Sequence, residues 1–413
     1  MSTATAPIVI VGAGHAGGRA ALTLCEEGFA GRIVLIGEEP HLPYERPPLS
    51  KGVLQGKATL EECCLFKGDA FDAARIEHLG GVKVSRIDPA SHRLELANGV
   101  GLTYSKLLLA TGGQSRRLVL GKEALSNIFY LRTYEEAVAL QRCLASHTRV
   151  VVIGGGFIGL EVAASSRKLG CQVTLLEAGP RLASRVLPER ISAELLAVHQ
   201  NKGVDVRLGV RIEELIGESA AEAVRLVSGE VIPCDLVIVG IGMEPNLALA
   251  KNAGLETGSG IKVNNYLQTS EPDIYAAGDV CEFRLGELGE FQRQETWRNA
   301  EFQGRYAALS ILGKQEPFSA IPWFWSDQYE WGLQTIGVLP ADAHVVERQF
   351  KNDNFILFYL DEQSHLVGAS GWGLGNSIAK DVKLCERLIE SQVALPAYSL
   401  ADPSVSLKSL MRH

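Results

Sequence analysis

Two short glycine-rich runs in this sequence have the spacing needed to bind the pyrophosphate of a dinucleotide. Residues 12–17 read G-A-G-H-A-G, and residues 154–159 read G-G-G-F-I-G. In a G-x-G-x-x-G run the first glycine makes a tight turn, the second lets the backbone approach the pyrophosphate, and the third lets a helix pack closely on a strand. The phosphates then lie at a helix N-terminus, where the helix dipole favours negative charge.

An acidic residue follows each run at a suitable distance. Glu38 comes after the apolar residues 33–37, and Glu177 comes after the apolar residues 173–176. Both glutamates fit the position about 20 residues downstream where a carboxylate accepts a hydrogen bond from a ribose hydroxyl. Two complete fingerprints in one chain predict two dinucleotide cofactors that exchange electrons.

The composition is typical of a globular protein. The chain has 413 residues, of which 46% are hydrophobic and 21% charged, so we expect two to four domains. The net charge of −8 disfavours nucleic-acid binding, and no apolar run approaches the ~20 residues that span a bilayer. The first residues lack the basic segment of a signal peptide, so we expect a cytoplasmic protein that binds neither nucleic acid nor membrane. The eight cysteines form no C-x-x-C pair, and we expect no metal site.

The elements that must position the two fingerprints form a duplicated α/β unit. We expect a first domain in two parts (1–113 and 244–321), a second domain (114–243) and a C-terminal domain (322–413). The expected closing elements are strands at 106–110, 236–239 and 274–277 and a helix near 296–312.

The C-terminal domain is expected to have a small α+β fold. Its predicted strands are residues 345–350, 355–360 and 366–369, with a turn at 352–354. A helix should follow, with Asn376 or Ser377 as its cap. The apolar face of this helix would carry Ile378, Val382, Cys385 and Ile389.

Several motifs together resemble one family. They are the two fingerprints, the segment R-P-P-L-S-K at 46–51, A-T-G at 110–112, L-E at 160–161, I-Y-A-A-G-D at 274–279 and P-W-F-W-S-D-Q at 322–328. The chain resembles the putidaredoxin reductase-like, NADH-dependent ferredoxin reductases of bacterial oxygenase systems, within the flavoprotein disulfide-reductase superfamily. This resemblance implies a glutathione-reductase-like α/β fold with two Rossmann-type domains and the small C-terminal domain.

The resemblance also assigns the first fingerprint to FAD. The residues that it implies for FAD are Gly12, Gly14, Ala16, Gly17, Glu38, Arg46, Pro47, Lys51, Val84, Ala110, Thr111, Gly112, Arg132, Asp279 and Trp297, with Trp325 near the flavin. Glu38 would bind the adenosine ribose, Val84 would contact the adenine, and Asp279 would bind a ribityl hydroxyl.

The second fingerprint is assigned to NADH by the same resemblance. The implied residues are Gly154, Gly156, Ile158, Gly159, Glu177 and Gly242. Lys51 and Glu161 are the implied catalytic residues: a lysine beside the flavin would stabilise negative charge on it, and a carboxylate partner would reduce the cost of burying that lysine.

The segment from Glu39 to Lys57 contains no cysteine. Disulfide reductases of this superfamily carry a redox cysteine pair beside the flavin, and NADH peroxidases and oxidases carry one cysteine. Without a thiol, electrons should leave the flavin directly for a one-electron acceptor, a ferredoxin of the 2Fe–2S type that feeds a Rieske dioxygenase or a haem monooxygenase. The alternatives are an NADH oxidase or peroxidase and an NADH-sensing flavoprotein of the apoptosis-inducing-factor type. We expect a monomer or a weak homodimer.

Turnover should therefore need no cysteine. We expect the native, NADH-reduced protein to keep its rate of ferredoxin reduction after its accessible thiols have been alkylated. A loss of more than about tenfold, with FAD content and fold unchanged, would contradict an electron path that avoids thiols.

Overall fold

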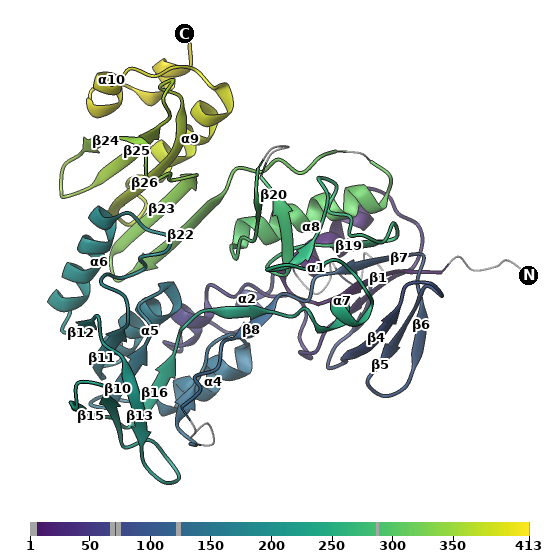
Figure 1. Ribbon diagram of the computed structural model, residues 1–413, viewed down its shortest axis with the longest axis horizontal. Helices are drawn as coiled ribbons and strands as arrows, with labels where there is room; N and C mark the ends of the chain where they lie inside the picture. Colours follow the sequence, from purple (N-terminus) through teal and green to yellow (C-terminus); the bar gives the residue numbers. More distant parts are fainter. Residues whose placement is uncertain are drawn as a thin grey trace, which may run out of the picture. The chain divides into compact units, whose positions relative to one another are not determined.

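The computed structural model contains two compact units. It describes residues 6–66, 71, 76–120, 125–285, 289–314 and 316–412, and the remaining residues, some of which fall inside the expected domain ranges, lie outside the description. The first unit contains Met1–Pro47, Thr59–Gln114 and Met243–Ala320, and the second contains Pro48–Ala58, Ser115–Gly242 and Ile321–His413. Figure 1 labels the elements of both units.

The centre of the first unit is a five-stranded parallel sheet. Its strand order is β19-β7-β1-β2-β3, with β1 (Ile8–Val11), β2 (Ile33–Ile36), β3 (Ile76–Leu79), β7 (Lys106–Leu109) and β19 (Ile274–Ala276). Its three inner strands are buried at every residue except Lys106, the first of β7, as expected for a parallel sheet covered on both faces. The expected strands 106–110 and 274–277 are β7 and β19, and each is one residue shorter than predicted.

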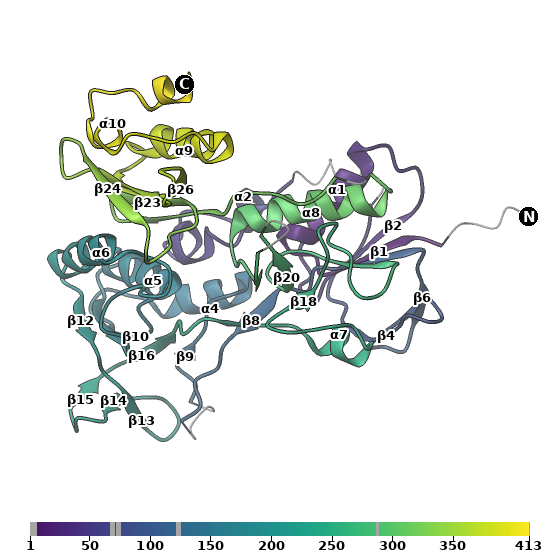
Figure 2. The same cartoon turned by 45° about the horizontal axis from the view of Figure 1, so that its top comes forward.

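Two helices pack side by side in this unit. They are α1 (His15–Glu26), which follows β1 directly, and α8 (Trp297–Ile311), which is the helix expected near 296–312. Figure 2 shows the pair. A Cβ on Gly304 would lie 2.4 Å from the carbonyl oxygen of Ala16, so only glycine permits this close packing.

Smaller elements complete the first unit. They are α2 (Leu60–Cys63), the sheet β4 (Val84–Asp88), β5 (Arg93–Leu96) and β6 (Gly101–Thr103), the strands β8 (Gly113–Ser115) and β17 (Met243–Pro245), α7 (Ala248–Asn252), and the sheet β18 (Ile261–Lys262), β20 (Cys281–Arg284) and β21 (Phe291–Gln292). Across the described residues of both units, every helix is too short or too polar to cross a bilayer.

The second unit repeats the plan of a parallel sheet with helices. Its strand order is β12-β11-β10-β16-β9, with β9 (Ile128–Phe129), β10 (Arg149–Ile153), β11 (Gln172–Glu177), β12 (Asp205–Leu208) and β16 (Leu236–Val239). The predicted strand 236–239 is therefore confirmed as β16. The other elements are η1 (Leu49–Val53, a π-helical turn), α4 (Tyr134–Cys143), α5 (Phe157–Lys168), α6 (Glu189–Asn201), and the sheet β13 (Ile212–Ile216), β14 (Ala223–Leu226) and β15 (Val231–Pro233).

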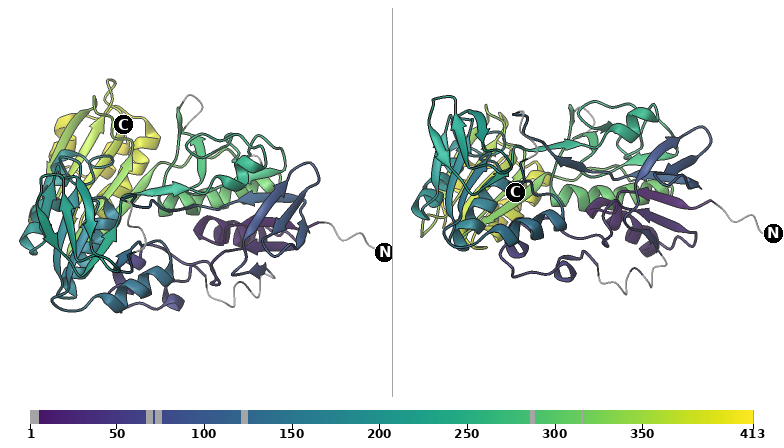
Figure 3. Two further views of the ribbon diagram at one scale, coloured as in Figure 1. Left: turned by 60° about the horizontal axis from the view of Figure 1, so that its bottom comes forward. Right: turned by 90° about the horizontal axis from the view of Figure 1, so that it is seen from below.

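The C-terminal part of the second unit is an antiparallel sheet covered by a helix. The strand order is β22-β23-β26-β25-β24, with β22 (Trp323–Gln328), β23 (Trp331–Gly337), β24 (His344–Gln349), β25 (Phe355–Leu360) and β26 (Leu366–Leu374). Helix α9 (Ala379–Ser391) packs on β26 and β23, and α10 (Ala397–Ala401) and the 3-10 helix η2 (Leu407–Arg412) follow. Both views in Figure 3 show this part in yellow-green and yellow.

Three details of this part differ from the predictions. The predicted strand 345–350 is β24, which begins and ends one residue earlier. The predicted strand 366–369 continues to Leu374, because it pairs along its length with both β23 and β25. The predicted cap of α9 was wrong: the N-cap residue is Ile378, which makes no side-chain cap, and burial of its apolar side chain determines the helix start instead.

Candidate functional site

The first fingerprint is a turn that only glycine can make. Gly12 has a φ of +111°, and a Cβ on it would lie 2.1 Å from the carbonyl oxygen of Ala110, at the end of β7. A Cβ on Gly17 would lie 1.9 Å from the carbonyl oxygen of Gly12. Contacts below 3.0 Å are essentially never seen for a real Cβ, so both positions exclude a side chain.

The middle glycine of this run has a different environment. Within the described part of the chain, no heavy atom comes within 4 Å of a Cβ built on Gly14. Gly14 is also the N-cap of α1, where no described side chain caps the helix and no acidic residue occupies the first turn. The helix start is therefore open to an anion, and its shape and dipole fit a pyrophosphate.

The second fingerprint has the same construction. Gly154 has a φ of +106°, and its Cβ would lie 2.4 Å from the carbonyl oxygen of Gly240, while a Cβ on Gly159 would lie 2.0 Å from the carbonyl oxygen of Gly154. A Cβ on Gly156, the N-cap of α5, would again meet no described heavy atom within 4 Å. The second unit thus holds a second cradle that fits a pyrophosphate.

The two downstream glutamates are held differently. Glu38 follows β2 with an exposed side chain, and its Oε1 lies 3.4 Å from Nζ of Lys83. Glu177, at the end of β11, accepts hydrogen bonds from the backbone N–H groups of Gly155 and Gly179, both at 2.6 Å. Because a carboxylate has about four acceptor sites, Glu177 keeps capacity for ribose hydroxyls beside the second cradle.

Asp279 is brought to the first cradle by a glycine turn. Gly278 has a φ of +81°, and a Cβ on it would lie 2.9 Å from the Cβ of Ala16 in the first fingerprint. The backbone N–H of Gly278 donates to Oε1 of the buried Gln303 at 2.8 Å. This loop places Asp279 directly after the contact with Ala16, which fits a contact with the same dinucleotide.

Arg46 is a partly buried cation in the first unit. Its Nη2 donates to Oε1 of Glu39 at 2.8 Å, and the hydroxyl of Tyr44 donates to the other oxygen of Glu39. Burial opposes the charge on Arg46, but Tyr44, Glu39 and Asp279 outweigh it and raise the pKa of the guanidinium. Arg46 therefore stays charged at every physiological pH.

The other residues predicted to bind FAD in this unit lie on several elements. Thr111 and Gly112 follow β7, and their carbonyl groups accept hydrogen bonds from the side chain and backbone of Asn246 at 2.8 and 3.0 Å. Val84 is buried in β4. Trp297 begins α8, and its Nε1 donates to Oε1 of Glu45 at 2.9 Å. Pro47 is the last residue of the unit's first segment.

Lys51 and Glu161, the predicted catalytic pair, meet in the second unit. Lys51 lies in η1, Glu161 lies in α5, and Nζ of Lys51 is 3.0 Å from Oε1 of Glu161. The Glu161 side chain is only 6% exposed. It also accepts hydrogen bonds from the hydroxyl groups of Ser50 at 2.5 Å and Ser326 at 2.6 Å. Three donors thus offset the cost of burying the carboxylate.

Four further predicted residues belong to the second unit. Arg132 lies just before α4, and its backbone N–H donates to Glu136 at 2.7 Å. Ile158 is 44% exposed in the first turn of α5, and Gly242 has a φ of +102°. Trp325 stacks on Trp323 with ring centroids 5.0 Å apart.

Sequence reasoning assigned no role to the two serines that bind Glu161. Ser50 and Ser326 both lie inside segments that carried the family resemblance, and that position was the available signal. Sequence reasoning also assigned no role to Gly155. Its N–H donates to Glu177, and a Cβ built on it would lie 2.9 Å from Oε2 of that glutamate.

Five of the eight cysteines are poorly suited to redox chemistry because they are buried. Cys63, Cys171, Cys234, Cys281 and Cys385 are buried. Burial raises the pKa of the Cys63 and Cys171 thiols, and it raises the pKa of Cys234 to about 11. Since the thiolate is the reactive form, these groups are largely unreactive near neutral pH.

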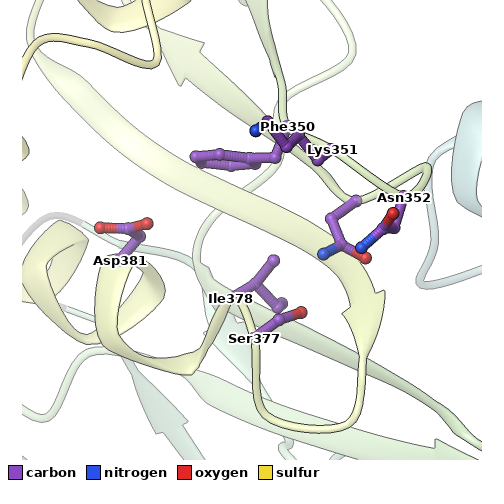
Figure 4. Close-up of a pocket in the computed structure, with 7 residues that line it drawn as sticks. Phe350, Lys351, Asn352, Ser377, Ile378 and Asp381 are labelled. Carbon is purple, nitrogen blue, oxygen red and sulfur yellow. The ribbon is translucent and has the colours of Figure 1, made fainter.

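A pocket of about 310 Å³ lies in the C-terminal part of the second unit. Figure 4 shows it between the turn after β24, where Phe350 and Asn352 lie, and the start of α9, where Ser377 and Asp381 lie. None of its lining residues belongs to the predicted site.

Comparisons with known proteins cover nearly the whole chain. Residues 6–304 match the family model described as pyridine nucleotide-disulphide oxidoreductase, and residues 323–411 match the model described as reductase C-terminal. The chain is 42% identical over 407 residues to the 5,5'-dehydrodivanillate O-demethylase ferredoxin reductase subunit of a Sphingobium species, with 97% of each chain covered.

Two further proteins are also similar to this chain over nearly its whole length. The chain is 38% identical over 401 residues to the ferredoxin–NAD(+) reductase component of the p-cumate 2,3-dioxygenase system of Pseudomonas putida, covering 97% of each chain. Its structure is similar to that of putidaredoxin reductase in a covalent complex with putidaredoxin, with a TM-score of 0.93, 36% identity and 99% of each chain covered.

The two kinds of glycine in the second cradle predict two different mutant effects. Gly156→Ala should fold normally, because its Cβ meets no described protein atom, and should raise KM for the dinucleotide about tenfold by intruding on the pyrophosphate. Gly159→Ala should lower Tm, because its Cβ meets a carbonyl oxygen at 2.0 Å. Thermal denaturation and steady-state kinetics on both variants test this, and an unchanged KM in folded Gly156→Ala would contradict the assignment of the cradle.

Proposed function

Since the chain belongs to the pyridine nucleotide-disulphide oxidoreductase family, and within it to the ferredoxin reductases of oxygenase systems, we propose that it transfers electrons from NADH to a ferredoxin. The ferredoxin, of the 2Fe–2S type, would feed a Rieske dioxygenase or a haem monooxygenase. We place the protein in the cytoplasm, where NADH is available. The observation that carries the proposal is the ion pair between Lys51, which lies in a segment without any cysteine, and the buried carboxylate of Glu161.

The first cradle fits FAD. When bound, FAD accepts a hydride from NADH and releases electrons one at a time. The open helix start at Gly14 would hold the pyrophosphate, Glu38 the adenosine ribose, and Asp279 a hydroxyl of the ribityl chain. Arg46 would keep a fixed positive charge close to Asp279.

The second cradle fits NADH. The helix start at Gly156 would hold the pyrophosphate, and Glu177 would accept hydrogen bonds from the adenosine ribose while it keeps its bonds to Gly155 and Gly179. Those two N–H groups hold the carboxylate in place before the ribose arrives. Preorganisation of this kind lowers the cost of binding.

Lys51 and Glu161 would provide the electrostatics of the hydride transfer. The ammonium group of Lys51 stabilises negative charge that develops near it, and Glu161 holds this ammonium group at 3.0 Å. Because residues 39–57 contain no cysteine, the segment around Lys51 offers no thiol relay, which favours a ferredoxin over a disulfide as the acceptor.

Lys51→Met should slow reduction of the flavin by NADH while FAD stays bound. Losing one preorganised charge costs 10²–10³ in rate where its geometry is ideal, and we expect a loss of about 10- to 100-fold. Stopped-flow absorbance measures the reduction of the flavin. Once its flavin is reduced, the wild type should reduce a 2Fe–2S ferredoxin much faster than it reduces oxygen. Lys57→Met, at an exposed lysine of the same segment, is the matched control. Reduction of the Lys51→Met flavin at the wild-type rate would exclude this role.

The wild type should prefer NADH to NADPH by about 100-fold, equivalent to about 2.7 kcal/mol, because a 2′-phosphate would be repelled by Glu177. Arg181 offers no compensation, since its guanidinium donates to the carbonyl groups of Leu187 and Ser184 at 2.6 and 2.9 Å and to Ser192 at 2.9 Å. Glu177→Ala should reduce the preference for NADH over NADPH. Values of kcat/KM for both nucleotides test this, and an equal ratio in wild type and variant would show that Glu177 does not discriminate.

A further inference from the structure

A line of buried polar side chains runs away from Glu161 within the second unit. Oε1 of Glu161 accepts from the hydroxyl of Ser326 at 2.6 Å, and Nε2 of Gln328 lies 3.2 Å from Oγ of Ser326. Oε1 of Gln328 lies 2.7 Å from Nε2 of His199, and the hydroxyl of Tyr329 lies 3.5 Å from Nδ1 of His199. Ser326, Gln328 and His199 are each at most 2% exposed.

Three elements contribute to this line. Glu161 lies in α5, Ser326 and Gln328 lie on β22, and His199 lies near the end of α6. Ser326 and Gln328 are two residues apart on a strand, so their side chains lie on the same face of the sheet. The C-terminal sheet thus connects one residue of the catalytic pair to a buried histidine of the second unit.

The charge on Glu161 determines the direction of every hydrogen bond in the line. An ionised carboxylate only accepts, so Ser326 must donate its proton to it. The lone pairs of Ser326 then accept from the amide nitrogen of Gln328, whose oxygen must accept from Nε2–H of His199. His199 is left with an acceptor at Nδ1, which faces the hydroxyl of Tyr329. If every hydrogen bond in the line were reversed, no proton would lie between the Ser326 oxygen and the Glu161 carboxylate.

The ionisation states of the two outer groups agree with this direction. Burial lowers the pKa of His199, although its bond to Gln328 opposes the shift, so the imidazole stays neutral at pH 7. Burial also raises the pKa of Tyr329, so its hydroxyl keeps the proton that it donates.

We propose that Ser326, Gln328 and His199 are positioning residues for the hydride transfer, forming a one-way hydrogen-bond chain that holds the Glu161 carboxylate aimed at Lys51. This proposal rests on the proposed function of the Lys51–Glu161 pair. A fixed proton on Ser326 prevents Glu161 from rotating away from Lys51, and each donor in the line polarises the next. The expected result of breaking the chain is slower hydride transfer without loss of either nucleotide.

The test compares variants that keep or remove one donor. His199→Gln retains an N–H at the position of Nε2, whereas His199→Met and Gln328→Met remove a link at similar volume. At saturating NADH, stopped-flow flavin reduction should slow about 3- to 10-fold in both methionine variants, with Kd for NADH within about twofold of the wild type. His199→Gln should stay within about twofold in rate. Thr335→Val, which removes a buried hydroxyl that bonds Ser370 elsewhere in the C-terminal sheet, is the matched control and should be unchanged.

A spectroscopic measurement tests the direction of the chain independently of the rates. In protein labelled with 15N-histidine, the His199 signal, assigned by its loss in His199→Gln, should show a protonated Nε2 and an unprotonated Nδ1. A proton on Nδ1 alone, wild-type rates in both methionine variants, or an equal loss in His199→Gln and His199→Met would each overturn the proposal. If the methionine variants do not fold, the rate of His199→Gln and the position of the proton on the His199 ring still test the proposal. If Lys51→Met slows flavin reduction but the His199 and Gln328 variants do not, only the proposed hydrogen-bond chain is refuted. A wild-type rate in Lys51→Met would instead refute the role of the Lys51–Glu161 pair.

Discussion

The structure depends on one steric constraint, the close crossing of a helix start over the end of a strand. Cβ atoms on Gly17 and Gly159 would lie 1.9 and 2.0 Å from carbonyl oxygens, so each turn exists only because these residues have no side chain. The crossing directs the N-terminus of α1 or α5 toward the carboxyl edge of its sheet. Both cradles follow from that geometry.

The two cradles share a backbone but differ in their acidic residue. Glu38 is exposed beside a surface lysine, whereas Glu177 is held by two backbone N–H groups of its own unit. A carboxylate that the protein holds in place discriminates better between a ribose hydroxyl and a phosphate, because it cannot move aside at low cost. This difference suits a resident FAD in the first cradle and an exchanging NADH in the second.

The C-terminal sheet supplies one of the hydrogen-bond donors to Glu161. Burying an unpaired carboxylate costs several kcal/mol, and Glu161 avoids this cost through Lys51 and two serine hydroxyls. One of those hydroxyls comes from β22, and behind it Gln328 and His199 complete a buried polar network. β22 is the edge strand of this sheet, and it pairs with β23 along its whole length, which fixes the position of Ser326.

The local elements and the cofactor class could be predicted from the sequence, because a G-x-G-x-x-G turn and an apolar strand are determined by residues a few positions apart. Strands at 236–239 and 355–360 and the helix near 296–312 were predictable for this reason. The start of α9 was not, because burial of Ile378 outweighed the polar capping residues beside it. The environment of Glu161 was decided only by the tertiary structure: its serine partners are 111 and 165 positions away in the chain. A serine has no sequence pattern that shows which distant carboxylate it will meet, since that contact forms only when α5, η1 and β22 pack together.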